Sequence, residues 1–182
     1  MSNKLSVIIP FMAIDNEKYQ VLEDTVKTFT GADEVIVVWN DGMGYAKPIN
    51  IGLRIAKGDF LMVMNDDMTW DGGSLKRLCQ EDAVTSPKVN GRVQEFWGCS
   101  FCLPRWVYEK IGGMYEGYRI SYFDDDDMKE TLKKHGIPMR CVEDVNVTTQ
   151  GGRTLERFPD RNDFFEENRQ LFIKRWGYDP SN

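Results

Sequence analysis

Apolar and polar positions alternate in blocks along the first 70 residues. Short apolar runs rich in β-branched residues predict buried strands at 5–10, 33–42 and 60–68. Between them, helical spacing of apolar residues predicts a helix over 16–31, and a second, short helix is expected over 47–58. The order strand, helix, strand, helix, strand with short connections favours a parallel sheet with helices on its faces.

Polar clusters stand where the second and third predicted strands end. Asn-Asp-Gly occupies 40–42, and Asn-Asp-Asp occupies 65–67. Ligands of parallel sheets bind beyond the carboxyl ends of the strands. The two clusters are therefore expected to lie at one ligand-binding edge.

The second half of the chain has a different pattern. It predicts short strands within 85–105, a short helix ended by paired glycines, an acidic run leading into a helix over 128–136, a strand with a glycine turn within 137–154, and a closing helix over 160–177. The pattern contains no internal repeat and no linker, so we expect one domain.

Composition narrows the class of protein. A chain of 182 residues with 41% hydrophobic residues and five tryptophans is typical of one globular domain. Its apolar runs are far shorter than the ~20 residues of a membrane span, and its start lacks the features of a signal peptide. We therefore expect a cytoplasmic protein without a transmembrane segment. The net charge of −6 argues against a nucleic-acid-binding surface, and four scattered cysteines argue against a disulfide framework.

Common cofactor motifs are incomplete in this chain. The glycines after the second strand are followed by Lys47 where a dinucleotide fingerprint needs a third glycine, and no phosphate-binding P-loop sequence occurs. Cys99 and Cys102 form a single CxxC, which is too few ligands for zinc and favours packed thiols. His135 lies at a basic helix end, where it complements the helix dipole.

The end of the third strand is a candidate metal site. Burying carboxylates without a partner is costly, and a divalent cation such as Mg²⁺ or Mn²⁺ would remove that cost by taking their oxygens as ligands. The alternative is a polar strand-end turn in which Asp67 caps the following segment. The sequence leaves both interpretations open.

The four aspartates at 124–127 have three possible uses: a helix cap, a calcium loop or proton transfer. A calcium loop counted from Asp124 needs glycine sixth and glutamate twelfth, but Lys129 and His135 stand there. Acids at a helix start complement its dipole, yet one or two would suffice. Crowding of these four carboxylates should raise the pKa of at least one of them, which suits a group that accepts a proton.

Six motifs in this order resemble the family 2 glycosyltransferases, which have the GT-A fold. They cover nearly the whole chain and are "SVIIP", "VIVVWNDG", "NIGLRIAKGDFLMVMNDDM", "GCSFCLPRWVYEKIGGMYEGY", "YFDDDDMKETLKKHG" and "FIKRWG". The chain departs from the family pattern at four positions. Asn40 and Asn65 replace acids, Met43 replaces a serine, and Thr149 replaces a histidine before the Gly-Gly turn.

The resemblance implies a fold and an activity. The fold is a single α/β GT-A domain over 1–182, a mostly parallel central sheet flanked by helices, with a nucleotide-sugar half at 1–70 and an acceptor and catalytic half at 71–182. The activity is an inverting, metal-dependent glycosyl transfer. A nucleotide-diphosphate sugar, foremost a UDP-sugar, would donate to a hydroxyl of a saccharide, lipid-linked glycan, protein or modified nucleobase.

The resemblance also implies roles for individual residues. Asp67, assisted by Asp66 or Asn65, would hold Mn²⁺ or Mg²⁺. Asp125 would be the catalytic base, with Asp124 at the family's glutamate position and Asp127 structural or contacting the acceptor. Asp126 would be a solvated helix residue. The expected nucleotide-sugar-binding residues are Pro10, Asp41, Asn50, Asp66 and Arg153.

Two other functions remain as alternatives. A sugar-nucleotide nucleotidyltransferase would carry a glycine-rich, arginine-containing loop after the first strand, but "PFMAIDNE" has no glycine. A non-catalytic protein that binds nucleotide sugar or metal is compatible with Asn40, Asn65 and Thr149, because each replaces a more usual group.

Overall fold

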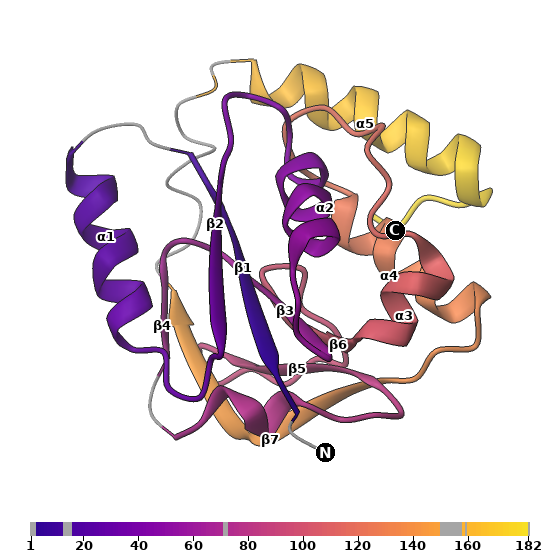
Figure 1. Cartoon of the computed structure of the whole chain (residues 1–182). Coiled ribbons are helices and arrows are strands. Elements are labelled where there is room, and N and C mark those ends of the chain that lie inside the picture. The colour runs from indigo at the N-terminus through magenta and orange to yellow at the C-terminus, as the bar shows by residue number, and fades with distance from the viewer. Residues whose placement is uncertain (1–2, 13–15, 71–72, 150–157, 159, 182) are drawn as a thin grey trace.

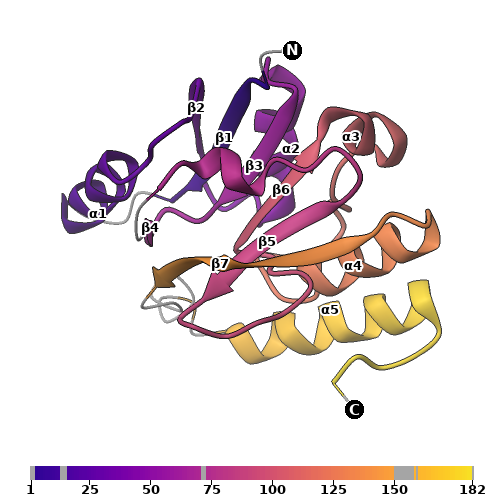
Figure 2. The ribbon, with the colours of Figure 1, turned by 90° about the horizontal axis from the view of Figure 1, so that it is seen from below.

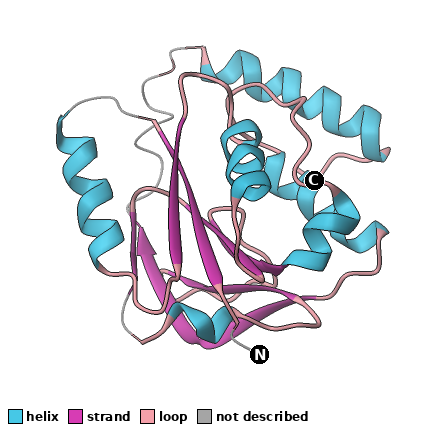
Figure 3. Cartoon of the chain, viewed as in Figure 1, coloured by secondary structure: helices cyan, strands magenta, loops and turns pink. Residues whose placement is uncertain are grey.

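The computed structural model describes residues 3–12, 16–70, 73–149, 158 and 160–181. In this part of the chain, seven strands form one sheet in the order β2-β1-β3-β6-β5-β7-β4 (Figure 1). Helices lie to both sides of the strands (Figure 3). Within the described residues, no helix combines the length and hydrophobicity needed to cross a membrane.

The predicted strand and helix order of the first half is confirmed. The elements are β1 (Leu5–Phe11), α1 (Asn16–Lys27), β2 (Glu34–Trp39), α2 (Ala46–Ile55) and β3 (Phe60–Met64). β1 pairs in parallel with both β2 and β3. The third strand ends at Met64 and not at 68, because the chain turns at 65–67 and continues as the short strand β4 (Met68–Trp70).

The second half contains the predicted strands and helices and one further helix. The elements are η1 (Leu75–Leu78), β5 (Val84–Val89), β6 (Ser100–Pro104), α3 (Arg105–Ile111), α4 (Asp124–Lys134), β7 (Met139–Thr149) and α5 (Arg161–Trp176). α4 begins at Asp124, so the aspartates form its first turn and do not merely precede it.

The sheet is mixed, whereas the sequence predicted it to be mostly parallel. β6 runs antiparallel to β3 and β5, and β4 runs antiparallel to β7. A parallel neighbour needs a crossover, usually a helix. The connection between β5 and β6 carries no helix, so the chain reverses there.

Two apolar layers cover the sheet. Ile8 of β1 packs with Ile49 and Leu53 of α2, whereas Val7 and Ile9 belong to the layer on the opposite face, against which α1 packs. Burial on both faces explains why β1 is continuously apolar. A Cβ added to Gly52 would lie 2.3 Å from Ile8 Cγ2, so this glycine lets α2 approach the sheet closely.

The closing helix α5 lies against α4 (Figure 2). Asp127 on α4 is buried and joins the two helices. Its Oδ2 accepts hydrogen bonds from Arg175 Nε at 2.8 Å and Trp176 Nε1 at 2.7 Å. The Tyr118 hydroxyl donates to the same oxygen at 2.9 Å. Asp127 therefore holds the end of the chain to the acidic helix.

Candidate active site

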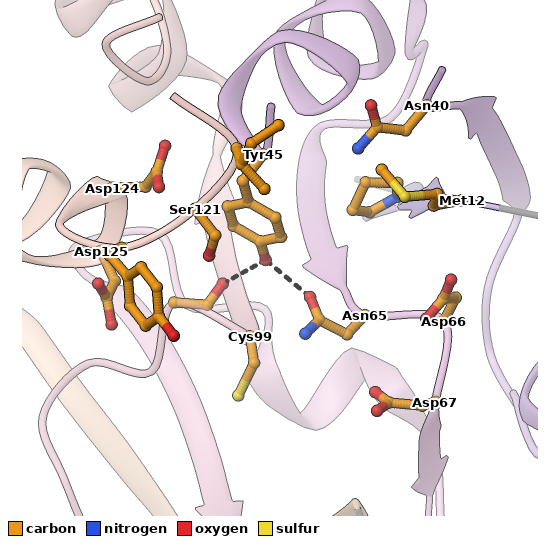
Figure 4. Close-up of a pocket in the computed structure, with 14 residues that line it drawn as sticks. Met12, Asn40, Tyr45, Asn65, Asp66, Asp67, Cys99, Ser121, Asp124 and Asp125 are labelled. Carbon is orange, nitrogen blue, oxygen red and sulfur yellow. Dashed lines mark hydrogen bonds between the residues drawn. The ribbon is translucent and has the colours of Figure 1, made fainter. Parts of the chain in front are cut away.

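A cavity of about 290 Å³ opens where β1 and β3 end (Figure 4). Both halves of the chain contribute to its wall. It is lined by Pro10, Met12, Asn40, Tyr45, Asn65, Asp66, Asp67, Gly98, Cys99, Ile120, Ser121, Tyr122, Asp124 and Asp125. Asp66 and Asp67 lie on one side, and Asp124 and Asp125 on the other, with Tyr45 between them (Figure 4).

Asp66 is a buried acid with a protein partner. Its Oδ1 accepts from Lys18 Nζ at 2.7 Å, and both side chains are about one-tenth exposed. The Thr25 hydroxyl donates to the Asp66 backbone oxygen at 3.2 Å. Burial raises the pKa of Asp66, and Lys18 opposes that shift. Asp66 therefore fixes α1 to the end of β3.

Asp67 has an unsatisfied carboxylate. Its Oδ1 is buried and has no hydrogen-bond partner among the described residues. Those residues also include no group of three or more His, Cys, Asp or Glu side chains that could hold a metal. Mg²⁺ is usually held by one or two carboxylates, and substrate phosphates and water complete its shell. The orphaned oxygen of Asp67 and the neighbouring amide of Asn65 fit such a site, with oxygen ligands that also suit Mn²⁺.

The turn after β2 places Asn40 in the cavity wall and Asp41 outside it. Asn40 Nδ2 donates to the Gly44 backbone oxygen at 2.9 Å, and its Oδ1 accepts from the Met43 backbone N–H at 3.0 Å. The amide therefore stabilises the turn both as a donor and as an acceptor. A carboxylate at this position could only accept hydrogen bonds. Asp41 is exposed beside it.

The aspartates of α4 point in different directions, some toward the cavity and one toward α5. Asp124 and Asp125 line the cavity, and Asp127 points to α5. Asp126 is half-buried and does not line the cavity, so the expected solvated position is only partly observed.

The segment before this helix has an unusual backbone. Ile120, Tyr122 and Phe123 have φ values of 59°, 78° and 68°, in the left-handed region that non-glycine residues seldom occupy. Asn168 of α5 is buried, accepts from the Arg119 backbone N–H and donates to the Ser121 backbone oxygen. Strained backbone persists where the surroundings hold it and is concentrated at functional sites.

Asp124 is a buried acid whose side chain is left without a hydrogen bond by the described residues. It is 5% exposed, and neither carboxylate oxygen has a hydrogen-bond partner among the described residues. Burial raises its pKa well above the ordinary value, and the charges of Asp125 and Asp127 raise it further. Burial and Asp125 also raise the pKa of Asp126. The crowding expected from the sequence therefore acts on Asp124 and Asp126.

Replacing Asp124 should change stability in a pH-dependent way. The pKa is higher in the folded state, so protonation favours folding and stability falls as pH rises through the folded-state pKa. Asp124→Asn should therefore raise the melting temperature at pH 8, by about 2–4 °C for each kcal/mol gained, and the gain should shrink toward pH 4. Thermal unfolding across this pH range tests this. The exposed Asp163→Asn is the control, and an equal gain at every pH would contradict the account.

Gly98 sets the position of Asp125. A Cβ added to Gly98 would lie 2.3 Å from the Asp125 Cβ, closer than real Cβ atoms approach. Gly98→Ala should displace Asp125 and lower turnover about 100-fold, the scale expected for a misplacement of roughly 1 Å. Steady-state kinetics and donor binding measure this effect. The melting temperature of the variant is the control for damage to the fold. Unchanged turnover in Gly98→Ala would contradict the packing argument.

The remaining predicted residues lie in different places. Pro10 lines the cavity, but Asn50 does not. Asn50 exchanges two hydrogen bonds with the backbone of Met114, at 2.8 and 2.9 Å, and holds the loop after α3. Arg153 and the Gly-Gly turn lie outside the described residues. Thr149 shares a second hollow with Asp67.

Several lining residues were not expected from the sequence. They are Met12, Tyr45, Gly98, Cys99, Ile120, Ser121 and Tyr122. Tyr45 follows a glycine turn and Gly98 precedes a strand, so both carried a weak positional signal. The other side chains have types that equally suit a core or a surface, and only the folded chain brings them to this edge.

Solved structures share this fold at low identity. Drosophila β-1,4-galactosyltransferase 7, a mutant in complex with manganese, UDP-Gal and xylobiose, is 14% identical with a TM-score of 0.66, covering 89% of this chain and 79% of that one. The mannosyltransferase PcManGT of Pyrobaculum calidifontis, in complex with GDP-Man and Mn²⁺, is 15% identical with a TM-score of 0.63, covering 98% of this chain and 66% of that one. These likenesses confirm the GT-A fold.

Sequence comparison identifies the family. Curated proteins give no match. The model of glycosyl transferase family 2 matches residues 6–99, just over half of the chain. The match includes the end of β3 with Asp66 and Asp67 and stops before the acidic helix. The chain is a glycosyltransferase that belongs to family 2.

Proposed function

We propose that this protein transfers a sugar from a nucleotide-diphosphate sugar to an acceptor hydroxyl, with a divalent cation and with inversion at the anomeric carbon. One observation carries the proposal: two pairs of carboxylates face each other across one cavity, and one pair includes the unsatisfied Asp67. The structural neighbours were solved in complex with UDP-Gal or GDP-Man and manganese. These complexes support a nucleotide-diphosphate sugar as the donor and Mn²⁺, in preference to Mg²⁺, as the cation.

The two halves of the chain have different roles, one in binding the donor and one in binding the acceptor. Residues 1–70 supply the donor side, with Pro10 and Asp66 in the wall and Asp41 at the exposed turn where a base or ribose would bind. Residues 71–182 supply the acceptor side. Arg153 is our candidate for the diphosphate, and Asn50 acts by holding the loop after α3.

Asp67 and Asn65 would hold the cation. When bound, Mn²⁺ or Mg²⁺ supplies Lewis-acid stabilisation of the charge that develops on the leaving diphosphate. Asp66 is already paired with Lys18 and keeps the strand end and α1 together. Its role is to fix the position of the neighbouring ligand.

Asp125 takes the proton of the acceptor hydroxyl as the hydroxyl oxygen attacks the anomeric carbon. It lies across the cavity from Asp67 (Figure 4), an arrangement that supports attack from the side opposite the leaving diphosphate. A single displacement of this kind inverts the anomeric configuration. Burial favours the protonated form of Asp124, which lies beside the base in the cavity wall.

Turnover with a panel of sugar nucleotides tests the function. The protein is incubated with Mn²⁺, each donor and saccharide, lipid-linked, peptide and nucleoside acceptors, and nucleoside diphosphate release is followed. We expect nucleoside diphosphate to be released with one donor class. The anomeric proton signal in the NMR spectrum of the product should show the configuration opposite to that of the donor. Formation of sugar nucleotide from a nucleoside triphosphate and a sugar phosphate would favour the nucleotidyltransferase instead. Donor binding without any turnover would favour a binding protein.

A further inference from the structure

Tyr45 connects the two sides of the cavity. It directly precedes α2, and its hydroxyl lies 2.7 Å from Asn65 Oδ1 and 2.8 Å from the Gly98 backbone oxygen (Figure 4). Asn65 follows β3 on the side of Asp67, and Gly98 packs against Asp125. One hydroxyl therefore touches both the cation side and the base side.

The Tyr45 hydroxyl cannot donate a hydrogen bond to both Asn65 and Gly98. A tyrosine hydroxyl has one proton, and a backbone carbonyl only accepts. A tyrosine hydroxyl keeps that proton at neutral pH, because its ordinary pKa is about 10. The oxygen and nitrogen of an asparagine amide exchange places by a half turn of the group, and the surrounding hydrogen bonds decide between the two orientations.

Only one arrangement satisfies every group. Tyr45 donates to the Gly98 oxygen, and the Asn65 amide is turned so that its NH₂ donates to the Tyr45 hydroxyl. The amide oxygen then faces away from Tyr45 and is not used by its hydroxyl, so it is available as a ligand. An aspartate would need no such orientation, because both of its terminal atoms are oxygens.

We propose that Tyr45 is a positioning residue, which orients the amide of Asn65 so that its oxygen serves as a cation ligand. The inference rests on the proposed function, because it assumes the cation site at Asp67. It explains how an amide can stand where the family pattern has an acid. Groups that orient metal ligands typically change metal affinity by about 10–100-fold when they are removed.

A double-mutant cycle on Mn²⁺ binding tests the inference without turnover. The dissociation constant of Mn²⁺ is measured by electron paramagnetic resonance, with UDP present, for the wild type, Tyr45→Phe, Asn65→Asp and the double variant. Tyr45→Phe should weaken Mn²⁺ binding by about 10-fold or more in the wild type. It should have little effect in the Asn65→Asp background, where no amide has to be oriented.

The other outcomes are decisive as well. An equal loss in both backgrounds would show that Tyr45 supports the fold of the site only, and no loss in the wild type would also overturn the inference. Both results leave the proposed function intact, because the wild type would still bind Mn²⁺. A wild type that binds no Mn²⁺ would overturn the metal-dependent function and this inference together. Tyr108→Phe on α3, outside the cavity wall, is the matched control, and melting temperatures establish that each variant folds.

Discussion

Asp125→Asn should lower sugar transfer by about 10²–10⁴-fold and leave donor binding unchanged. The amide has the shape of the carboxylate but cannot take a proton from the acceptor hydroxyl. Asp125 lines the cavity, and among the described residues its side chain has no hydrogen bond that the substitution would break, so the fold should be kept. Single-turnover rates together with donor affinity from calorimetry measure the two effects separately.

Asp126→Asn is the matched control. Asp126 is its neighbour on the same helix and does not line the cavity, so its amide variant should retain turnover. Equal loss in both variants would mean that the acidic run acts as a whole. Loss of donor binding in Asp125→Asn would contradict its assignment as the base.

Asp67→Asn should lower cation-dependent turnover by about 10²–10³-fold, because a bound cation contributes several kcal/mol to the stabilisation of charge in the transition state. Donor affinity should fall with it, since the cation joins the donor to the protein. The melting temperature should not fall, because Asp67 Oδ1 is buried without a partner in the described part of the chain and the amide removes that unpaired charge.

Turnover against Mn²⁺ concentration and thermal unfolding without metal measure these two effects. Asp163→Asn on the exposed face of α5 controls for the loss of one negative charge. A variant that loses stability and keeps its Mn²⁺ dependence would show that Asp67 is a structural turn residue, the alternative that the sequence left open.

The first half of the fold could be predicted because its signals are local. An apolar run such as 5–10 is buried on both faces, and the helix spacing is complete within each segment. β4 and η1 have three and four residues, too few for any periodicity to appear. The antiparallel direction of β6 depends on how the chain turns between β5 and β6, and that turn leaves no hydrophobic pattern.

The types of residue in the candidate site could be predicted from the sequence. The directions in which their side chains point were harder to predict. The carboxylates at 65–67 and 124–127 were visible as residue types at strand and helix ends. Which aspartate faces the cavity depends on contacts far along the chain: Asp127 is taken by Arg175 and Trp176, 48 and 49 residues away. Likewise, Asn50 is used by the loop at Met114, 64 residues away. Such partners cannot be deduced from local spacing.

The most direct test of the central claim is a crystal structure of the protein with UDP and Mn²⁺. Our account predicts Mn²⁺ bound to Asp67 and to the diphosphate, inside the cavity between β3 and α4, with the terminal phosphate facing Asp125. A nucleotide bound outside this cavity, or a cation without contact to Asp67, would contradict it.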